Sequence, residues 1–198
     1  MVGQQNNTKP LEVAGRNVNK FGKSKLFSYI CNNLNLVMEK GNIYWFTGQP
    51  AHGKTVLGKK LVELLQSEKR NWRKDVFHLD GDDLRALTVN KDYSEQGRIN
   101  NIRNAQMIAE YLSTKGCDVV VSLVAPYEWL REEFKERIGL DNFQEFYVHC
   151  STPRERDHFH AKDYVAPQKN FFDVDTTKDN PEQSFTKIVN HLREENKL

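Results

Sequence analysis

The eight residues from Gly48 to Thr55 constrain this chain more than any other stretch. They read G-Q-P-A-H-G-K-T and match the phosphate-binding pattern G-x-x-x-x-G-K-T. An apolar strand over residues 43–46 leads into the pattern, and apolar residues at helical spacing follow it. The two glycines permit a tight turn, whose backbone N–H groups and following helix N-terminus suit a phosphate group. The predicted ligand is therefore a nucleoside triphosphate.

Several positions of this loop have an expected role. Lys54 is expected to reach the β- and γ-phosphates, and the Thr55 hydroxyl is expected to bind Mg²⁺. Pro50 stiffens the loop, and His52 either aids phosphate binding or faces solvent. Contacts to ATP are predicted along the whole run: Gly48, Gln49, Pro50, Ala51, His52, Gly53, Lys54, Thr55 and Val56.

The composition is that of an ordinary globular protein, with 38% hydrophobic and 28% charged residues in 198. A net charge of +2 gives no reason to expect nucleic acid or an anionic membrane as a partner. No apolar run approaches the ~20 residues of a membrane span, and no signal-peptide pattern is present, so we expect a cytoplasmic enzyme. Cys31, Cys117 and Cys150 lack C-x-x-C spacing, and buried, reduced thiols are expected.

Predicted strands alternate with predicted helices, which indicates a three-layer α/β P-loop NTPase fold with a mainly parallel five-stranded sheet. The strands are expected at residues 43–46, 76–79, 118–124, 143–150 and 171–174. Helices are expected after the phosphate loop and at residues 98–115, 126–138 and 181–193, with an irregular substrate loop at 84–97.

The chain is predicted to divide near residue 40. Residues 1–40 form an N-terminal extension with one helix, at 26–38, and residues 41–198 form the P-loop domain. The extension is expected to pack against the domain or against another subunit, which leaves a homodimer open.

Acidic residues follow the second predicted strand, where an open parallel sheet binds its ligands. Asp80 is expected to face the γ-phosphate, either as general base for an acceptor hydroxyl or as a ligand of a Mg²⁺-bound water. The neighbouring Asp82 and Asp83 are the better candidates for capping the next helix.

Arg85, Arg98 and Arg103 are spaced to line a wall that binds an anionic acceptor. A GTPase is excluded, because Asn90-Lys91-Asp92 is one residue short of N-K-x-D and lies too close behind the phosphate loop. A motor or transport ATPase would need an apolar strand that ends in an acid, whereas Asp118 begins its strand. A kinase fits best.

Further segments carry a family pattern: His78–Arg85 (HLDGDDLR), Tyr93–Arg103 (YSEQGRINNIR), Ser122–Tyr127 (SLVAPY), and Tyr164–Pro167 (YVAP) with Asp175-Thr176. With Trp45–Gly48 they make the chain, from about Gly41 onward, similar to the adenylylsulfate (APS) kinase family. Members of that family phosphorylate the ribose 3′-hydroxyl of adenosine 5′-phosphosulfate, which gives PAPS.

The resemblance implies that Lys54 and Asp80 are catalytic and that Thr55 and Asp80 serve Mg²⁺. It implies that the acceptor's phosphate and sulfate are held by Arg85, Arg98 and Asn101, and that Tyr93 stacks on its base. The remaining acceptor contacts are expected at Asp82, Ser122, Leu123, Val124 and Lys162. Arg154 and Arg156 are expected to contact ATP.

The chain departs from the family pattern in three places. The loop reads Q-P-A-H where the family has a Ser/Gly-rich sequence, and Ala125 replaces a serine. The family's long lid is reduced to residues 158–163, between Asp157 and Tyr164. His158 and His160 lie close in this segment, but no Cys or carboxylate set completes a metal site with them.

The sequence therefore predicts a Mg·ATP-dependent kinase that phosphorylates a hydroxyl of a small anionic nucleotide-type acceptor, with APS as the named candidate. Because the lid is short, a different nucleotide conjugate is the main alternative. An example is a cytidine-diphosphate derivative such as CDP-phosphoramidate, made for surface-polysaccharide modification. A non-catalytic nucleotide-binding module is a second alternative, and the intact Lys54, Thr55 and Asp80 argue against it.

Overall fold

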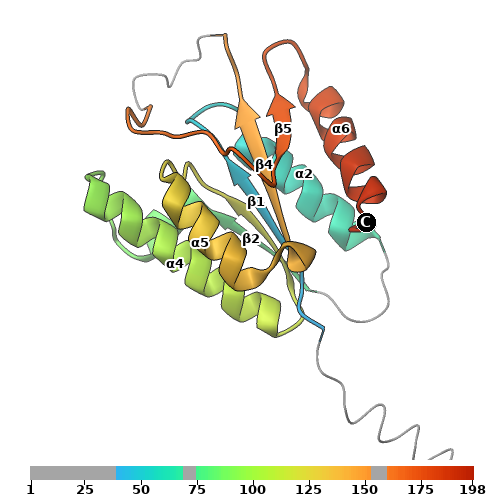
Figure 1. Cartoon of the computed structure of the whole chain (residues 1–198), viewed down its shortest axis with the longest axis horizontal. Coiled ribbons are helices and arrows are strands. Elements are labelled where there is room, and N and C mark those ends of the chain that lie inside the picture. Colours follow the sequence, from blue (N-terminus) through green and yellow to red (C-terminus); the bar gives the residue numbers. More distant parts are fainter. Residues whose placement is uncertain (1–38, 69–74, 153–159) are drawn as a thin grey trace, which may run out of the picture. The chain divides into compact units, whose positions relative to one another are not determined.

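Five parallel strands form the centre of the domain (Figure 1). The computed structural model describes residues 39–68, 75–152 and 160–198. The strand order is β2-β3-β1-β4-β5. The strands are β1 (Ile43–Thr47), β2 (Val76–Asp80), β3 (Asp118–Ser122), β4 (Phe143–His149) and β5 (Phe172–Asp175). Because all the pairs are parallel, the carboxyl ends of these strands share one edge, where ligands of such sheets bind.

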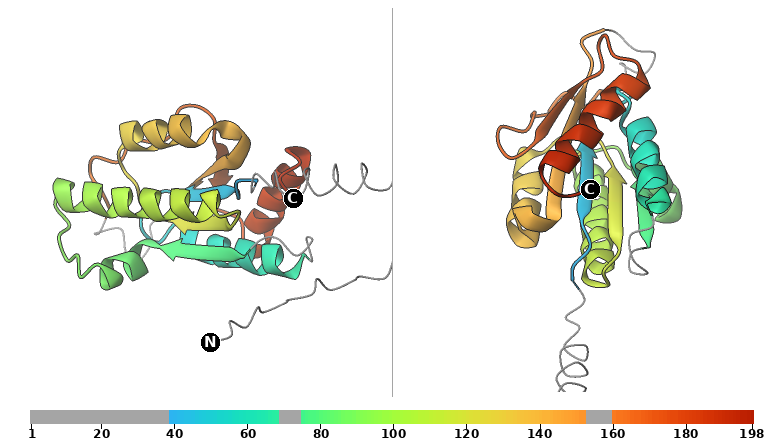
Figure 2. Two further views of the ribbon diagram at one scale, coloured as in Figure 1. Left: turned by 90° about the horizontal axis from the view of Figure 1, so that it is seen from below. Right: turned by 90° about the vertical axis from the view of Figure 1, so that its right-hand side faces the viewer.

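Helices cover both faces of the sheet, as Figure 2 shows. One face packs against α4 (Glu95–Thr114) and α5 (Glu128–Ile138), and the other packs against α2 (Lys54–Ser67) and α6 (Pro181–Glu194). The short α3 (Gly81–Leu87) follows β2 directly, and a 3₁₀ turn, η1 (Leu140–Asn142), precedes β4. The predicted three-layer fold with a five-stranded parallel sheet is confirmed.

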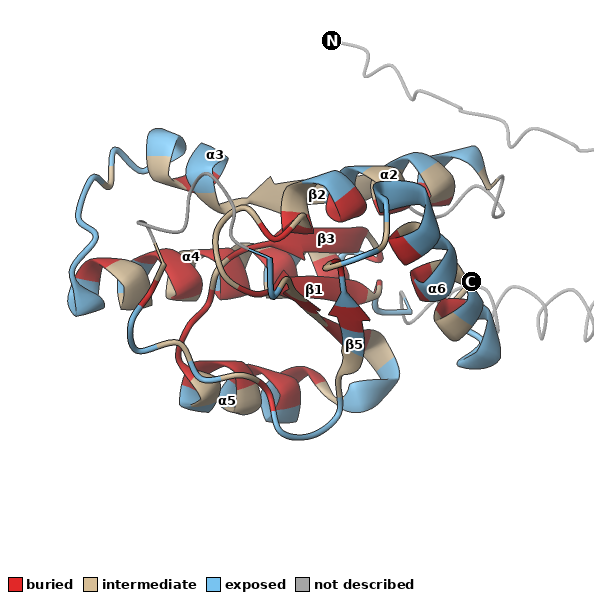
Figure 3. Ribbon diagram, turned by 90° about the horizontal axis from the view of Figure 1, so that it is seen from above, coloured by how far each residue is buried: buried red, intermediate tan, exposed pale blue. Residues whose placement is uncertain are grey.

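Burial on both faces explains why residues 43–46 of β1 are all apolar. Ile43 and Trp45 pack into the core under α4 and α5, whereas Tyr44 and Phe46 pack into the core under α2 and α6. Successive side chains of a strand point to opposite faces, so a central strand with both faces covered needs no polar side. Figure 3 shows β1 and β3 as buried strands inside partly exposed helices.

Every predicted element that falls within the described residues is present, with ends shifted by a few residues, but the stretch 84–97 is not irregular throughout. The short α3 extends to Leu87, and α4 begins at Glu95 because the Ser94 hydroxyl caps it by accepting from Gly97 N at 3.2 Å. Only residues 88–94 lie outside helices there. The predicted helix at 26–38 lies outside the described residues, so the division near residue 40 stays a prediction.

A buried ionic group ties α5 to the sheet. The fully buried carboxylate of Glu145 on β4 lies 3.0 Å from Arg131 Nε and 2.5 Å from Lys135 Nζ. Burial raises the pKa of Glu145, and the two cations oppose that shift. Breaking one member of such a group is costly because it leaves an uncompensated buried charge.

The cysteine prediction needs correction. Cys117 and Cys150 are free thiols, as expected, but both are partly accessible rather than buried. Cys31 lies outside the described residues. Within the described ranges, no helix combines the length and apolarity needed to cross a membrane.

Candidate active site

The phosphate loop leaves β1 through a glycine that no other residue could replace. Gly48 has φ +142°, and a Cβ built there would lie 2.0 Å from the Val148 carbonyl oxygen on β4. Because that neighbour is backbone, the chain could not make room for a side chain. Gly53, with φ +102°, ends the loop as the N-cap residue of α2. The loop is thus fixed by the sheet at one end and by a helix at the other.

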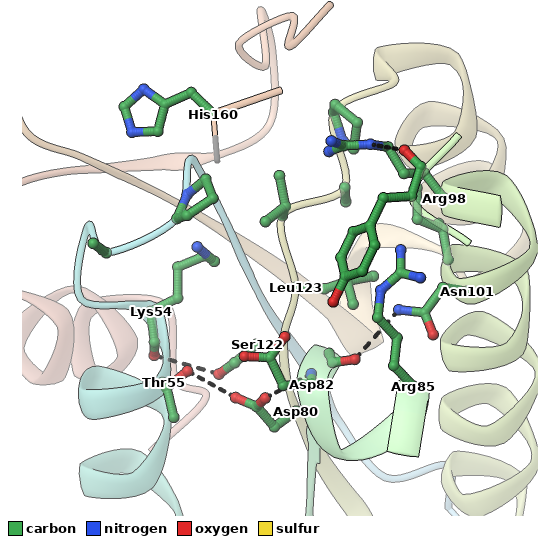
Figure 4. Close-up of a pocket in the computed structure, with 18 residues that line it drawn as sticks. Lys54, Thr55, Asp80, Asp82, Arg85, Arg98, Asn101, Ser122, Leu123 and His160 are labelled. Carbon is green, nitrogen blue, oxygen red and sulfur yellow. Dashed lines mark hydrogen bonds between the residues drawn. The ribbon is translucent and has the colours of Figure 1, made fainter. Parts of the chain in front are cut away.

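Lys54 and Thr55 begin α2 and lie at one end of the site (Figure 4). Lys54 is only 8% exposed, and its Nζ donates to the Gln49 carbonyl at 2.7 Å, so its ammonium group lies against the loop backbone. The Thr55 hydroxyl donates to Asp80 Oδ2 at 2.7 Å. Phosphate-loop and β2 residues therefore meet directly.

Asp80 ends β2 and stands opposite Ser122 in the pairing of β2 with β3. Its Oδ1 accepts from Asp82 N at 2.9 Å and caps α3, while its Oδ2 accepts from Thr55. The residue that caps α3 is thus Asp80. Asp82 and Asp83, which the sequence made the better candidates for this cap, do not fill that position. Each carboxylate oxygen has two acceptor positions, so one on each oxygen remains for a ligand.

A pair formed by His78 and Ser122 contacts the backbone of Lys54. Ser122 Oγ donates to the Lys54 carbonyl at 3.3 Å and lies 3.0 Å from His78 Nε2. A hydroxyl has a single proton, so Nε2 must be the donor to Ser122. Burial lowers the pKa of His78, and the nearby Asp80 opposes this shift. The net lowering favours a neutral ring, as a donor at Nε2 alone requires. Gly58 of α2 packs directly on the pair, because a Cβ there would lie 2.4 Å from Ser122 Oγ.

The opposite side of the site carries the cationic and aromatic residues predicted to hold an acceptor. The Arg85 guanidinium lies over the Tyr93 ring, 4.3 Å from its centroid, and its Nη1 donates to the Asp92 carbonyl at 2.7 Å. Arg98 Nε donates to the Tyr93 carbonyl at 3.0 Å. Tyr93 itself is 62% exposed. Both arginines are therefore held by the loop that follows α3.

One cavity of about 530 Å³ joins these two sides. The predicted residues that line it are Pro50, Ala51, Lys54, Thr55, Asp80, Asp82, Arg85, Tyr93, Arg98, Asn101, Ser122, Leu123 and Val124. Figure 4 places Lys54 and Thr55 at one end, Arg85 and Asn101 at the other, and Ser122 and Leu123 between them. A polyanion bound by the loop and an anion bound by the arginines would thus share one space.

Other predicted residues do not line this cavity. Among the described residues these are Gly48, Gln49, His52, Gly53, Val56 and Lys162, of which Val56 and Lys162 are exposed. Arg103 does not join the arginine wall, because its guanidinium binds Glu133 on α5 at 2.7 and 2.6 Å. His52 is buried rather than solvent-facing, at 6% exposure. Arg154 and Arg156 lie outside the described residues.

The sequence prediction missed several lining residues: Gly81, Ile102, Ala125, Pro126 and His160. Gly81, Ala125 and Pro126 lie inside segments already singled out at strand ends, so that neighbourhood could have indicated them. Ile102 lies within the predicted helix at 98–115, and helical spacing alone does not mark it as a site residue. His160 lies close to His158 in the sequence, a pattern that suggests a metal site and contains nothing that places it beside the phosphate loop.

Two hard oxygen ligands of the kind that Mg²⁺ prefers meet in the cavity. The Thr55 hydroxyl and the Asp80 carboxylate are 2.7 Å apart and both line it. Oxygen donors from one or two protein side chains, completed by phosphate and water, are the usual protein environment of Mg²⁺. The residues present therefore fit a Mg²⁺ ion bound together with a triphosphate.

Known proteins match this chain over most of its length. A family model described as adenylylsulphate kinase matches residues 40–188. Adenylyl-sulfate kinase of Pseudomonas aeruginosa is 31% identical over 176 residues, which cover 79% of this chain and 88% of that protein. Cytidine diphosphoramidate kinase of Campylobacter jejuni is 28% identical over 144 residues, which cover 71% of this chain and 81% of that protein.

Solved structures agree with the fold. An APS kinase of Mycobacterium tuberculosis, in complex with AMPPNP and APS, has a TM-score of 0.66 at 20% identity. The alignment covers 78% of this chain and 98% of that one. The likeness shows a shared fold.

Proposed function

The chain belongs to the adenylylsulphate kinase family, and we propose that its acceptor is a small anionic nucleotide with a free hydroxyl. Members of the family are ATP-dependent kinases with a hydroxyl acceptor, and this chain is such a kinase. What carries the proposal is the single cavity in which Lys54, Thr55 and Asp80 face Arg85 and Arg98. Two arginines opposite a phosphate loop suit an acceptor that is itself an anion.

The residues of the loop bind the donor. Lys54 and the loop N–H groups hold the triphosphate, and the loop keeps the γ-phosphoryl group facing the cavity. Thr55 and Asp80 would hold Mg²⁺, which when bound neutralises phosphate charge. The Gln49 carbonyl accepts from Lys54 Nζ, which directs the lysine side chain along the loop.

Asp80 faces the acceptor hydroxyl and accepts its proton. The carboxylate is held at two points, by Thr55 Oγ1 and by Asp82 N, so it is oriented before the acceptor arrives. Arg85 and Arg98 bind the acceptor's anionic group, and Tyr93 stacks on its base. A base held in one orientation at the junction of both subsites favours transfer to the acceptor over transfer to water.

APS is the first candidate acceptor, because the P. aeruginosa relative is an adenylyl-sulfate kinase. A cytidine-diphosphate conjugate is the second, because the C. jejuni relative is a cytidine diphosphoramidate kinase. One further observation favours the second candidate, namely that the segment between Asp157 and Tyr164 is short.

An acceptor panel tests the proposal. Purified protein with Mg·ATP would be offered APS, CDP-phosphoramidate, CDP and AMP, with ADP release measured by a coupled assay. Turnover of APS alone supports the first candidate, and turnover of the cytidine conjugate alone supports the second. If ATP binds but none of these acceptors is phosphorylated, both proposed acceptors are wrong.

A further inference from the structure

We propose that Gln49 is a positioning residue, whose side chain fixes His160 at the wall of the nucleotide end of the cavity. The inference rests on the proposed function in one respect only, namely that the phosphate loop binds ATP. It concerns a residue that does not itself line the cavity and a histidine for which the sequence suggested no such place.

The link between these residues is a pair of reciprocal hydrogen bonds. Gln49 Nε2 donates to the Ala161 carbonyl at 2.9 Å, and Ala161 N donates to Gln49 Oε1 at 2.9 Å. A primary amide is the neutral side-chain group that offers a donor and an acceptor side by side, so it can satisfy both backbone groups of one residue. Ala161 is 2% exposed, and its carbonyl also accepts from Tyr164 N at 3.2 Å, so it is the buried N–H of Ala161 that depends on the Gln49 amide.

Gln49 also contacts the phosphate-binding lysine. Its carbonyl oxygen accepts from Lys54 Nζ at 2.7 Å. One residue therefore contacts the lysine through its backbone and the segment that begins at His160 through its side chain. The phosphate loop therefore holds that segment in place through the Gln49 side chain.

His160 lies on the nucleotide side of the cavity. It lines the cavity with Pro50 and Ala51 of the loop, and its ring meets the His52 ring edge-on at 5.3 Å between centroids. Figure 4 shows His160 above Lys54 and away from Arg85 and Asn101. Displacing His160 should therefore weaken nucleotide binding and leave acceptor binding unchanged.

The rest of the segment is anchored independently, so loss of the Gln49 amide should not unfold it. Tyr164 OH lies 3.0 Å from Thr47 Oγ1, and Val165 N donates to the Pro126 carbonyl at 2.9 Å. Arg131 Nη2 donates to the Val165 carbonyl at 2.6 Å. The expected change is confined to the few residues nearest His160.

The test is a double-mutant cycle on nucleotide binding. Titration calorimetry with Mg·AMPPNP would compare wild type, Gln49→Leu, His160→Ala and the double variant. We expect Gln49→Leu to raise the Kd about 3- to 10-fold, the scale of one or two net hydrogen bonds. His160→Ala should do the same, and the double variant should be no weaker than the worse single variant.

Gln168→Leu is the matched control. Gln168 is an exposed glutamine of the same chain region, does not line the cavity, and donates to the Ala166 carbonyl at 3.0 Å. Its Kd for Mg·AMPPNP should equal that of wild type. The KM for the acceptor should stay unchanged in Gln49→Leu, and its melting temperature should stay within a few degrees, which separates positioning from a general loss of stability.

Each outcome decides the matter. Wild-type affinity in Gln49→Leu would overturn the positioning role, and so would fully additive effects, because Gln49 would then act without His160. Failure of the wild-type protein to bind Mg·AMPPNP would instead overturn the proposed function, together with the role built on it.

Discussion

The two ends of the cavity are built in different ways. At the nucleotide end, Lys54, Thr55 and Asp80 are held by hydrogen bonds between the loop, α2 and the ends of β2 and β3. At the acceptor end, the Arg85 and Arg98 side chains are held chiefly by carbonyls of residues 90–93. The first end is part of the core, whereas the second depends on one surface loop.

This difference has a functional meaning. Chemistry common to a family must stay on rigid elements, because small displacements of reacting groups cost much rate. Acceptor choice can be carried by a loop, since loops accept sequence change without loss of the core. We therefore expect substitutions at the nucleotide end to reduce turnover with every acceptor, and substitutions at the acceptor end to change KM for individual acceptors.

The largest effect should come from Lys54→Ala. Removal of the ammonium group takes away charge stabilisation in transfer and should lower kcat by ~10²-fold or more. Circular dichroism should show the fold retained, because the lysine side chain lines the cavity and is not part of either apolar core. Near-normal turnover would contradict the assigned role.

Asp80→Asn should abolish transfer while ATP still binds. The amide keeps the shape of the side chain but is a far weaker base, and we expect a loss of roughly 10²–10⁴-fold in kcat. Measured binding of Mg·AMPPNP separates this effect from loss of the nucleotide site. Unchanged transfer would remove Asp80 as the base.

A smaller and more selective effect is expected for Arg85→Ala. Loss of one charge-assisted contact should raise the acceptor KM about 10- to 100-fold and leave the KM for ATP nearly unchanged. Arg103→Ala is the matched control, since Arg103 pairs with Glu133 outside the cavity. An equal rise in both KM values would break the division between the two ends.

Gly58→Ala tests how tightly the nucleotide end is packed. The added methyl would lie 2.4 Å from Ser122 Oγ, so the hydroxyl must move and leave the Lys54 carbonyl. We expect a loss of about 1–3 kcal/mol in unfolding free energy, measured by urea denaturation. Lys59→Ala, at an exposed position of the same helix, should change stability little.

The smallest effect concerns pH. The pKa of His78 is lowered in the folded state by burial, so below about pH 6.5 the unfolded chain binds more protons at this residue. Stability is thus lost as pH falls from the unfolded pKa toward the folded one. His78→Gln, which keeps a donor to Ser122, should reduce the fall in melting temperature between pH 7.5 and 5.5 by on the order of 1–2 °C. An unchanged pH dependence would show that His78 titrates normally.

The phosphate loop could be located from the sequence because local geometry determines it. Gly48 cannot carry a side chain, and Lys54 and Thr55 must follow at fixed spacing, so the constraint is written in consecutive residues. The buried strands could be predicted equally well, since a strand buried on both faces requires an apolar run. Even α3 is understandable afterwards, because one side-chain cap at Asp80 starts a helix too short to show periodicity.

What the sequence could not give are partners distant along the chain. In the sequence, Arg103 is spaced like Arg98 as a candidate for the anion-binding wall. Only the packing of α4 on α5 pairs it with Glu133 instead. The Gln49–Ala161 pair joins residues more than a hundred positions apart, through backbone groups that carry no sequence signature. Likewise, only tertiary packing decides that His52 is buried.

The guanidinium of Arg131 has a consequence for how such enzymes diversify. It donates to the carbonyls of Ala125 and Val165 and pairs with Glu145 on β4, so it fastens the strand-end loop and the returning chain to the same strand. Because Arg131 holds Val165 in place, the chain returns to the site at the same position whatever the number of residues before it. The segment before Val165 could thus become longer or shorter in related enzymes with other acceptors, while the phosphate-transfer residues keep their positions.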